Sequence, residues 1–269
     1  MTEGPVELGY VDLLLASAML VVFGAVSVLA RLGLERKLAV ASVRAFVQLT
    51  VLGMVLLPIF AWQSPWPVLL WCVAMGLLAG REATARTQRS YRGMGWNSVL
   101  AMAVAGGGTA VFAQLVVLRV DPWWTPRYLI PLLGMILGNA LSGVSLGMDR
   151  AMSLLLERRR EIEAQLAVGA TRQEVGRDVV REATRTGLVP ILNTMSAVGL
   201  VSIPGMMTGQ LLGGTAPVQA ARYQFLILAL IAGAVAVGTL LAVVLTVRVG
   251  LDAEHRLRVE RFGDDATAG

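Results

Sequence analysis

Polar side chains that could bind a small solute are sparse in this 269-residue chain and lie within long apolar stretches. Arg44 and Gln48 are four residues apart, so on a helix they share one face. A guanidinium binds anions through a planar fork of N–H donors, and amides and hydroxyls add neutral hydrogen bonds. We therefore predict a transport pathway formed by Arg44, Gln48, Asn139, Asn193, Ser196, Ser202, Pro204, Gly205 and Gln210.

The residues of common catalytic centres are too few for most enzyme classes. The chain has one cysteine, Cys72, and one histidine, His255, which lies in a polar C-terminal segment. A Ser/His or Cys/His hydrolase needs that ring beside its nucleophile, and a thiolate metal cluster needs several cysteines. The only lysine, Lys37, is followed by Leu38, so no Gly-x-x-x-x-Gly-Lys-Ser/Thr phosphate loop can be written. We predict no catalytic residue, no metal site and no cofactor bound by this chain.

The composition indicates a membrane protein. Hydrophobic residues make up 56% of the chain and charged residues 15%, and the charges cluster between apolar runs. A helix needs about 20 apolar residues to cross a bilayer. We predict an all-α, polytopic integral membrane protein with about seven transmembrane helices, at residues 10–30, 39–60, 65–80, 97–118, 128–148, 187–212 and 222–247.

Basic residues alternate sharply between the two sets of loops. The segments 31–38, 81–96, 149–186 and 248–269 hold 19 Lys or Arg, whereas the opposite segments hold 3. The positive-inside rule then places the N-terminus outside and the C-terminus in the cytoplasm. This distribution also explains the basic isoelectric point, so we predict no nucleic-acid partner. Residues 1–250 form the predicted transmembrane domain, and residues 251–269 a polar C-terminal tail that we expect to fray.

Segment 149–186 is the longest predicted cytoplasmic piece. Asp149 can cap a first helix, Gly169 and Thr171 interrupt it, and Thr171 has Glu174 at the spacing of a capping box for a second helix through about residue 185. The pattern predicts a helix-turn-helix. Two interpretations remain open: an amphipathic hairpin resting on lipid, or a docking element for a cytoplasmic partner.

The sixth predicted span, 187–212, contains the strongest irregularity. Pro190, Pro204 and Gly205 weaken helical hydrogen bonding, so we expect a broken or kinked backbone around 203–206. Broken helices at membrane depth are tolerated where they are buried or line an aqueous cavity, which favours a place beside the pathway. No Asp or Glu lies deep in a predicted span, which disfavours ion-coupled transport. Arg44 could instead reach the headgroups, and Asn193 and Ser196 could simply bond between helices.

Glycines at small-xxx-small spacing predict close helix contacts. Such spacing lets two backbones approach. It occurs at Gly76 and Gly80, at Gly134 and Gly138, and at Gly205, Gly209 and Gly213.

Several strings resemble known transporter families. Glu163-Ala164-Gln165, followed by Gly169, resembles the front of the ATPase-coupling loop of ABC importer permeases, with Gln165 in place of the second Ala. The chain from about 10 to 250 more closely resembles the FetB-type ABC transporter permease family, which includes plant aluminium-tolerance permeases. The strings that carry this resemblance are LAVGAT at 166–171, PLLGMILGNA at 131–140 and VGLVSIPGMMTGQ at 198–210.

The resemblance implies a permease subunit of an ATP-binding-cassette transporter in the plasma (cytoplasmic) membrane. It implies a homodimer, a separate ABC ATPase subunit that uses ATP and Mg²⁺, and export of iron or a metal-stress-related substrate. The residues implied in ATPase coupling are Glu163, Ala164, Gly169, Ala170 and Thr171. The alternative is a polytopic membrane receptor or scaffold whose cytoplasmic hairpin binds a signalling partner.

Overall fold

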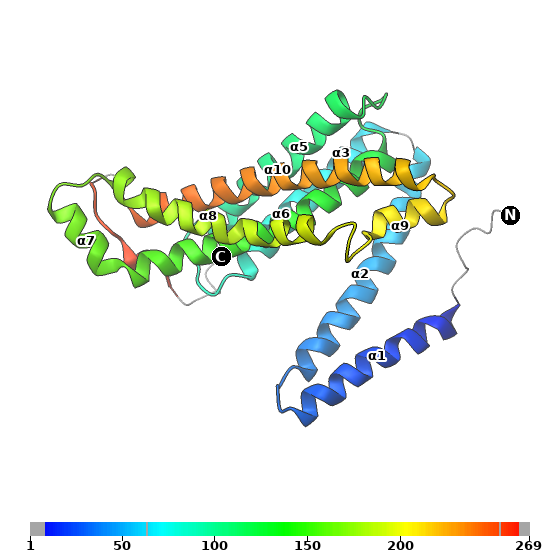
Figure 1. The fold of residues 1–269 in the computed structure, drawn as a ribbon, viewed down its shortest axis with the longest axis horizontal. Helices are drawn as coiled ribbons and strands as arrows, with labels where there is room; N and C mark the ends of the chain where they lie inside the picture. The colour runs from blue at the N-terminus through cyan, green and yellow to red at the C-terminus, as the bar shows by residue number, and fades with distance from the viewer. Residues whose placement is uncertain (1–8, 63, 253, 264–269) are drawn as a thin grey trace. The chain divides into compact units, whose positions relative to one another are not determined.

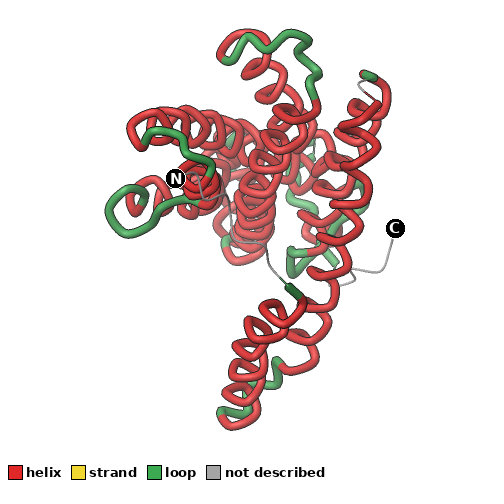
Figure 2. The backbone as a smooth tube through the Cα atoms, turned by 90° about the vertical axis from the view of Figure 1, so that its right-hand side faces the viewer, coloured by secondary structure: helices red, strands yellow, loops and turns green. Residues whose placement is uncertain are grey.

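The computed structural model describes residues 9–62, 64–252 and 254–263, and within them every regular element is a helix (Figure 2). The only β pairs there are three isolated bridges. In chain order the elements are α1 (Tyr10–Leu29), α2 (Glu35–Trp62), α3 (Pro65–Ala85), α4 (Met94–Met102), η1 (Ala103–Gly108), α5 (Thr109–Phe112), η2 (Ala113–Val117), α6 (Pro126–Glu157), α7 (Arg159–Ala167), α8 (Arg172–Ala197), α9 (Gly205–Leu212), α10 (Pro217–Gly250) and η3 (Val259–Arg261).

Six helical stretches in the described chain are long and apolar enough to cross a membrane. They correspond to α1, α2, α3, the run from α4 to η2, α6 and α10. The predicted span 187–212 is not one of them, because α8 ends at Ala197 and α9 begins only at Gly205. The third span is longer than predicted, since α3 continues to Ala85.

The chain divides into two compact parts, and the smaller contains α1, α2 and residues 209–216. A tight turn joins α1 to α2. Ser27, which is fully buried, holds it, because its hydroxyl donates to Glu35 Oε1 (2.8 Å) and accepts from the N–H of Leu34 (3.1 Å). Gly33 has a φ of +67°, which glycine adopts without strain.

The larger part comprises residues 64–208 and those from 217 onward, and its centre is the set α6, α8 and α10, which lie side by side in Figure 1. They meet where glycines remove side-chain bulk. A methyl group added at Gly187 would lie 2.5 Å from the carbonyl oxygen of Gly143 and 2.5 Å from Thr239 Cγ2. One added at Gly147 would lie 2.9 Å from Thr239 Cγ2. The three helices therefore approach closely only because these positions lack a Cβ.

The predicted close glycine contacts are present at only one clear position. A Cβ at Gly80 would lie 2.6 Å from the Cα of Val99, so α3 and α4 do approach there. Gly76, Gly138, Gly205 and Gly209 have no such neighbour within 4 Å.

The prediction that the C-terminal tail frays is wrong for its described residues. Asp252 accepts hydrogen bonds from the N–H of Arg256 (2.8 Å) and from Nε of Arg258 (2.8 Å). The Phe262 ring meets Tyr91 edge-on at a centroid distance of 6.1 Å, and Gly263 pairs with Ser90 through backbone hydrogen bonds. These contacts fold the segment back onto the loop between α3 and α4.

Candidate functional site

The helix-turn-helix predicted within 149–186 is present, with different boundaries. Asp149 does not cap a helix: it lies inside α6, which continues from the membrane-spanning stretch to Glu157, and its carboxylate accepts from the N–H of Gln88 (2.9 Å). The first helix of the hairpin is α7, and the second, α8, continues past residue 185 to Ala197. No residue between 149 and 157 breaks the helix, which explains the continuous α6.

The turn at the tip of the hairpin is closed by backbone hydrogen bonds. The N–H of Ala170 donates to the carbonyl of Gln165 (3.0 Å), and the N–H of Gly169 donates to that of Leu166 (3.1 Å). This pair of bonds is a Schellman motif with Gly169 just past the end of α7. Gly169 has a φ of +96°, a conformation that L side chains rarely adopt. The sequence therefore needs glycine at this position for the geometry of its own turn.

The predicted capping box at the start of α8 is confirmed. The Thr171 hydroxyl accepts from the N–H of Glu174 (3.3 Å), and Glu174 Oε2 accepts from the N–H of Thr171 (2.7 Å). The backbone hydrogen bond from Thr171, reinforced by its hydroxyl, lowers the pKa of Glu174. The next N–H, that of Arg172, donates to Nδ1 of His255 (2.9 Å). The first turn of α8 is thus capped by the Thr171 and Glu174 side chains and by His255.

A cluster of three charged residues joins the base of the hairpin to α6. Glu182 on α8 accepts from Arg150 on α6 (2.5 Å) and from Arg158 at the start of α7 (2.6 Å). The hydrogen bond from Arg150 and the nearby positive charges lower the pKa of Glu182. These ion pairs therefore connect the base of the hairpin to α6, which favours movement of the hairpin and α6 together as one rigid unit.

The tip of the hairpin presents the predicted ATPase-coupling residues to solvent. Ala164, Gly169 and Thr171 are exposed, and Glu163 is exposed and paired with Arg159 (2.8 Å). Ala170 is half-buried. Val168, which residue-level reasoning did not single out, is 86% exposed at the point of the turn. An apolar side chain at the tip of a charged hairpin suits insertion into a partner's groove.

Two predicted pathway residues of the larger part lie at nearly the same level of the bundle. The close approach of Gly143 to Gly187 sets an antiparallel register between α6 and α8, in which position 139 faces position 191. Asn139 therefore lies about 3 Å along the axis from the level of Asn193. Both residues are exposed, and Asn139 Nδ2 donates to the carbonyl of Met135 (2.8 Å). Ser196, one turn beyond Asn193, is also exposed and donates to the carbonyl of Leu192 (2.9 Å).

The sixth span is broken, but earlier than the predicted 203–206: α8 ends at Ala197 and α9 begins at Gly205, and Pro190 lies inside α8 without ending it. Gly199 has a φ of +83°, and its N–H donates to the carbonyl of Ser202 (2.9 Å), which makes a compact ordered turn. The Pro204 carbonyl accepts from the N–H of Thr208 (3.0 Å), so a new helix starts directly after the break. Leu200 and Val201 are 91% and 86% exposed. Large apolar side chains thus surround Ser202 on an uncovered face.

The remaining predicted pathway residues belong to the smaller part. Arg44 and Gln48 lie one turn apart on α2, and both are exposed. The Gln210 side chain has a buried Oε1 that meets no hydrogen-bond donor in the described chain.

Gln114 is a buried polar residue that the sequence analysis did not single out. Gln114 is fully buried in η2, and neither atom of its amide has a hydrogen-bond partner among the residues described. It follows η1, a second π-helical segment in the same span, and π-helical segments are frequent at functional sites. A lone glutamine in an apolar span was the available signal. No group of three His, Cys, Asp or Glu that could hold a metal ion occurs within the described residues.

Comparisons with known proteins give a consistent result. The sequence profile of UPF0014, described as an uncharacterised protein family, matches residues 10–250. A UPF0014 membrane protein of Synechocystis is 39% identical over 74% of this chain and 77% of its own length. The protein ALUMINUM SENSITIVE 3 of Arabidopsis thaliana is 31% identical over 93% of this chain and 91% of its own. The probable iron export permease protein FetB of Escherichia coli is 30% identical over 93% and 95%. No solved structure matches.

Proposed function

The chain belongs to the UPF0014 family of multi-pass membrane proteins, and from that premise we propose that it is the permease subunit of an ATP-binding-cassette exporter. A separate ATPase subunit hydrolyses ATP with Mg²⁺, and this chain forms the route through the plasma membrane. The printed description of its Escherichia coli relative as a probable iron export permease supports the assignment.

The observation that carries the proposal is the hairpin of α7 and α8. Its tip is closed by a Schellman motif and a capping box, its base is bonded to α6 through Glu182, and Val168 projects from its point. A rigid element of this kind can transmit movement of a bound ATPase to α6 and α8. A chain without a phosphate loop needs such a partner for ATP-driven work.

We further propose seven crossings, with the N-terminus outside. The C-terminal half of α8, the turn at 198–204 and α9 together form the broken sixth crossing. The 19 basic residues in one set of loops support the orientation. A broken crossing must be covered by protein or line water, because its free backbone groups cannot face lipid. Asn193, Ser196 and Ser202 are uncovered in the single chain, which supports a second copy of the chain facing them across a pathway.

The proposed cargo is iron or a related substrate of metal stress. Carboxylate, thiolate and imidazole ligands for a bare ion are scarce in the spans, whereas guanidinium, amide and hydroxyl groups are present. A chelated or anionic form of the metal therefore suits these guanidinium, amide and hydroxyl groups better than a naked cation does.

The experiment that tests the assignment is association with the ATPase. The chain is co-expressed with a candidate ATP-binding-cassette ATPase, the complex is purified in detergent, and bound ATPase and its hydrolysis rate are measured. Val168→Glu places a charge at the tip without altering the turn, and we expect it to lower ATPase binding at least tenfold. Leu32→Glu, at a leucine that is 53% exposed in the predicted cytoplasmic turn between α1 and α2, is the control and should leave binding unchanged. Equal binding by both variants would favour the receptor or scaffold alternative.

A further inference from the structure

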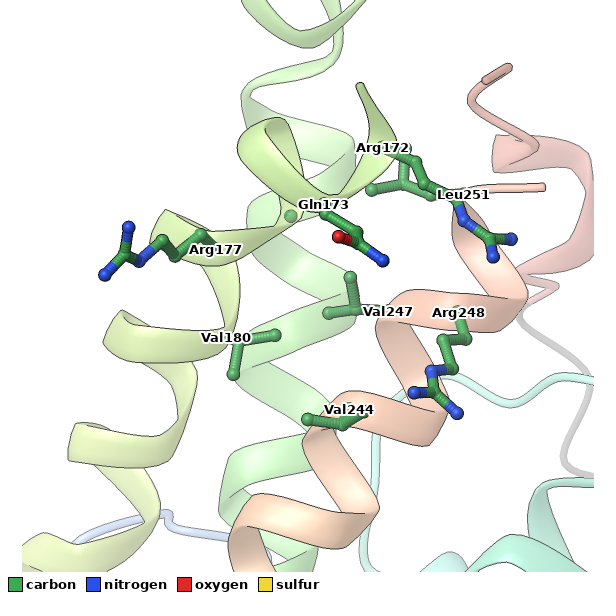
Figure 3. A pocket seen from close by; sticks show the side chains of 9 residues that line it. Arg172, Gln173, Arg177, Val180, Val244, Val247, Arg248 and Leu251 are labelled. Carbon is green, nitrogen blue, oxygen red and sulfur yellow. The ribbon is translucent and has the colours of Figure 1, made fainter. Parts of the chain in front are cut away.

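A cavity of about 310 Å³ lies between the start of α8 and the end of α10 (Figure 3). Its apolar floor consists of Val180, Val244, Val247 and Leu251. Polar side chains surround the opening: Arg172, Gln173 and Arg177 from α8, and Arg248 from α10. The hairpin tip at 168–171 and the predicted pathway residues are not part of its lining.

No carboxylate among the described residues pairs with the arginines around this cavity. The side chains of Arg172, Arg177 and Arg248 make no ion pair and no hydrogen bond with any described residue. Arg150, Arg158, Arg256 and Arg258, by contrast, all pair with carboxylates. Glu174 and Asp252, two acidic residues near the opening along the chain, are already bonded to Thr171 and to Arg256 and Arg258. The cavity is therefore cationic.

Polarity changes along the length of the cavity. Arg172 and Leu251 lie at one end, and Val180 and Val244 lie at the other, about 12 Å further along α8. In Figure 3 the guanidinium groups of Arg172 and Arg248 lie on the same side, and Arg177 points to the opposite side. The Gln173 amide lies between them. A phosphate could thus bind Arg172 and Arg248 while an apolar chain lies on the valines.

The cavity lies at the C-terminal end of α10, where the apolar run of that helix stops. α10 is one of the membrane-crossing stretches and ends at Gly250, so Val244 belongs to its apolar run and Arg248 to its last turn. Arginines at a helix end take up headgroup level. Basic pockets between membrane helices at this depth suit the headgroups of anionic lipids.

We propose that this cavity binds the phosphate headgroup and upper acyl chain of an anionic phospholipid. Arg172 and Arg248 hold the phosphate, Gln173 donates a neutral hydrogen bond, and Val180 and Val244 contact the acyl chain. The proposal requires only that α10 crosses the bilayer and does not depend on the ATPase partner. Because α8 carries the hairpin, a lipid bound here would also fix the start of α8 against the end of α10.

The test uses the full-length protein in neutral detergent with three probes: dioleoylphosphatidylglycerol, dioleoylphosphatidylcholine and inorganic phosphate. Bound lipid is counted by native mass spectrometry, and Kd is obtained from titration of the melting temperature. We expect the phosphatidylglycerol to bind most tightly, and the double variant Arg172→Gln, Arg248→Gln to weaken it on the order of tenfold or more.

The matched control is the double variant Arg181→Gln, Arg185→Gln, which removes two exposed arginines of the same helix outside the cavity. It should change the Kd less than twofold. Val180→Trp fills the apolar end of the cavity, so it should weaken the binding of the lipid but not the binding of free phosphate.

Three outcomes would overturn the proposal. The first is an equal loss of phosphatidylglycerol affinity in the two double variants, which would indicate a general charge effect. The second is a response to inorganic phosphate as strong as that to phosphatidylglycerol, which would indicate an ion site. The third is loss of ATPase binding with lipid binding intact in the Arg172 and Arg248 variant, which would indicate a protein contact.

Discussion

At the scale of single residues, Gly187 controls how closely α6, α8 and α10 approach. We expect Gly187→Ala to lower the free energy of unfolding by about 1–3 kcal/mol, because the added methyl group meets the Gly143 backbone and Thr239, not a flexible side-chain end. The measurement is the midpoint of a denaturing-detergent titration. Gly138→Ala is the control, since nothing lies within 4 Å of its Cβ position. An unchanged midpoint for Gly187→Ala would refute this arrangement of the helices.

We expect Arg44 to bind the negative charge of the transported substrate. Arg44→Ala should lower transport of chelated or anionic substrate while expression and ATPase assembly stay unchanged. Arg44→Lys should restore transport only in part, because a point charge does not reproduce the planar fork of donors. The comparison is initial flux at equal protein level. If Arg44→Ala leaves the flux unchanged, recognition would instead fall to the hydroxyl groups of the sixth crossing and to its methionines, Met195, Met206 and Met207.

At the scale of elements, the contact of α8 with α6 depends on pH through Glu182. Its pKa is lowered in the folded protein by the hydrogen bond from Arg150 and the nearby positive charges, so its stabilisation is fully present above the unfolded value of about 4.5 and is lost as pH falls through the folded value. We expect Glu182→Gln to cost at most about 1 kcal/mol near neutral pH, because the side chain is a third exposed. The difference from wild type should disappear in acid.

Glu157→Gln is the comparison variant for that experiment. Glu157 is 58% exposed and lies 3.3 Å from Arg150, so Glu157→Gln should lower the free energy of unfolding less than Glu182→Gln does. A stability difference between Glu182→Gln and wild type that persists unchanged in acid would contradict the role given to the ion pairs.

The elements differ in how far the sequence could predict them. The capping box at Thr171 and the break in the sixth span follow from local rules: the capping box is confirmed, and the break is present a few residues before the predicted position. The start of the hairpin was placed wrongly because Asp149 resembles a cap although its carboxylate is engaged by Gln88. Gly143 and Gly147 have the same spacing as the glycines that were singled out, so spacing alone could not separate the true crossing from positions without a neighbour. That distinction depends on the partner helix, as does the pairing of Glu182 with Arg150.

At the scale of the whole molecule, the orientation in the membrane is the prediction that places every loop. In a Cys72→Ala background, a cysteine at Ser64 should react with an impermeant thiol reagent from outside intact cells. A cysteine at the exposed Arg92 should react only after the membrane is opened. The 19 basic residues on the Arg92 side of the membrane are the reason. The reverse labelling pattern would invert the topology and place the hairpin outside, away from any ATPase.

The sequence predicts the all-helical membrane fold more reliably than it predicts the number of crossings. Long apolar runs predict helices because backbone groups in lipid must be bonded within the segment, and the six membrane-crossing stretches follow from that rule. The sixth predicted span shares the helix α8 with the charged second half of the hairpin, so no helix end marks where the span begins. The folded C-terminal segment depends on Asp252 and Phe262, which find their partners only in three dimensions.

The central claim is that this chain carries a solute across the membrane at the expense of ATP hydrolysed by another protein. The most direct measurement is ATP-dependent uptake into sealed inside-out vesicles that contain the chain and its ATP-binding-cassette partner, with free ferrous ion, chelated iron and organic anions compared. We expect saturable uptake of chelated or anionic substrate that requires both proteins and is lost in Val168→Glu. Absence of ATP-dependent uptake of all three substrates by an assembled, hydrolysing complex would contradict the claim.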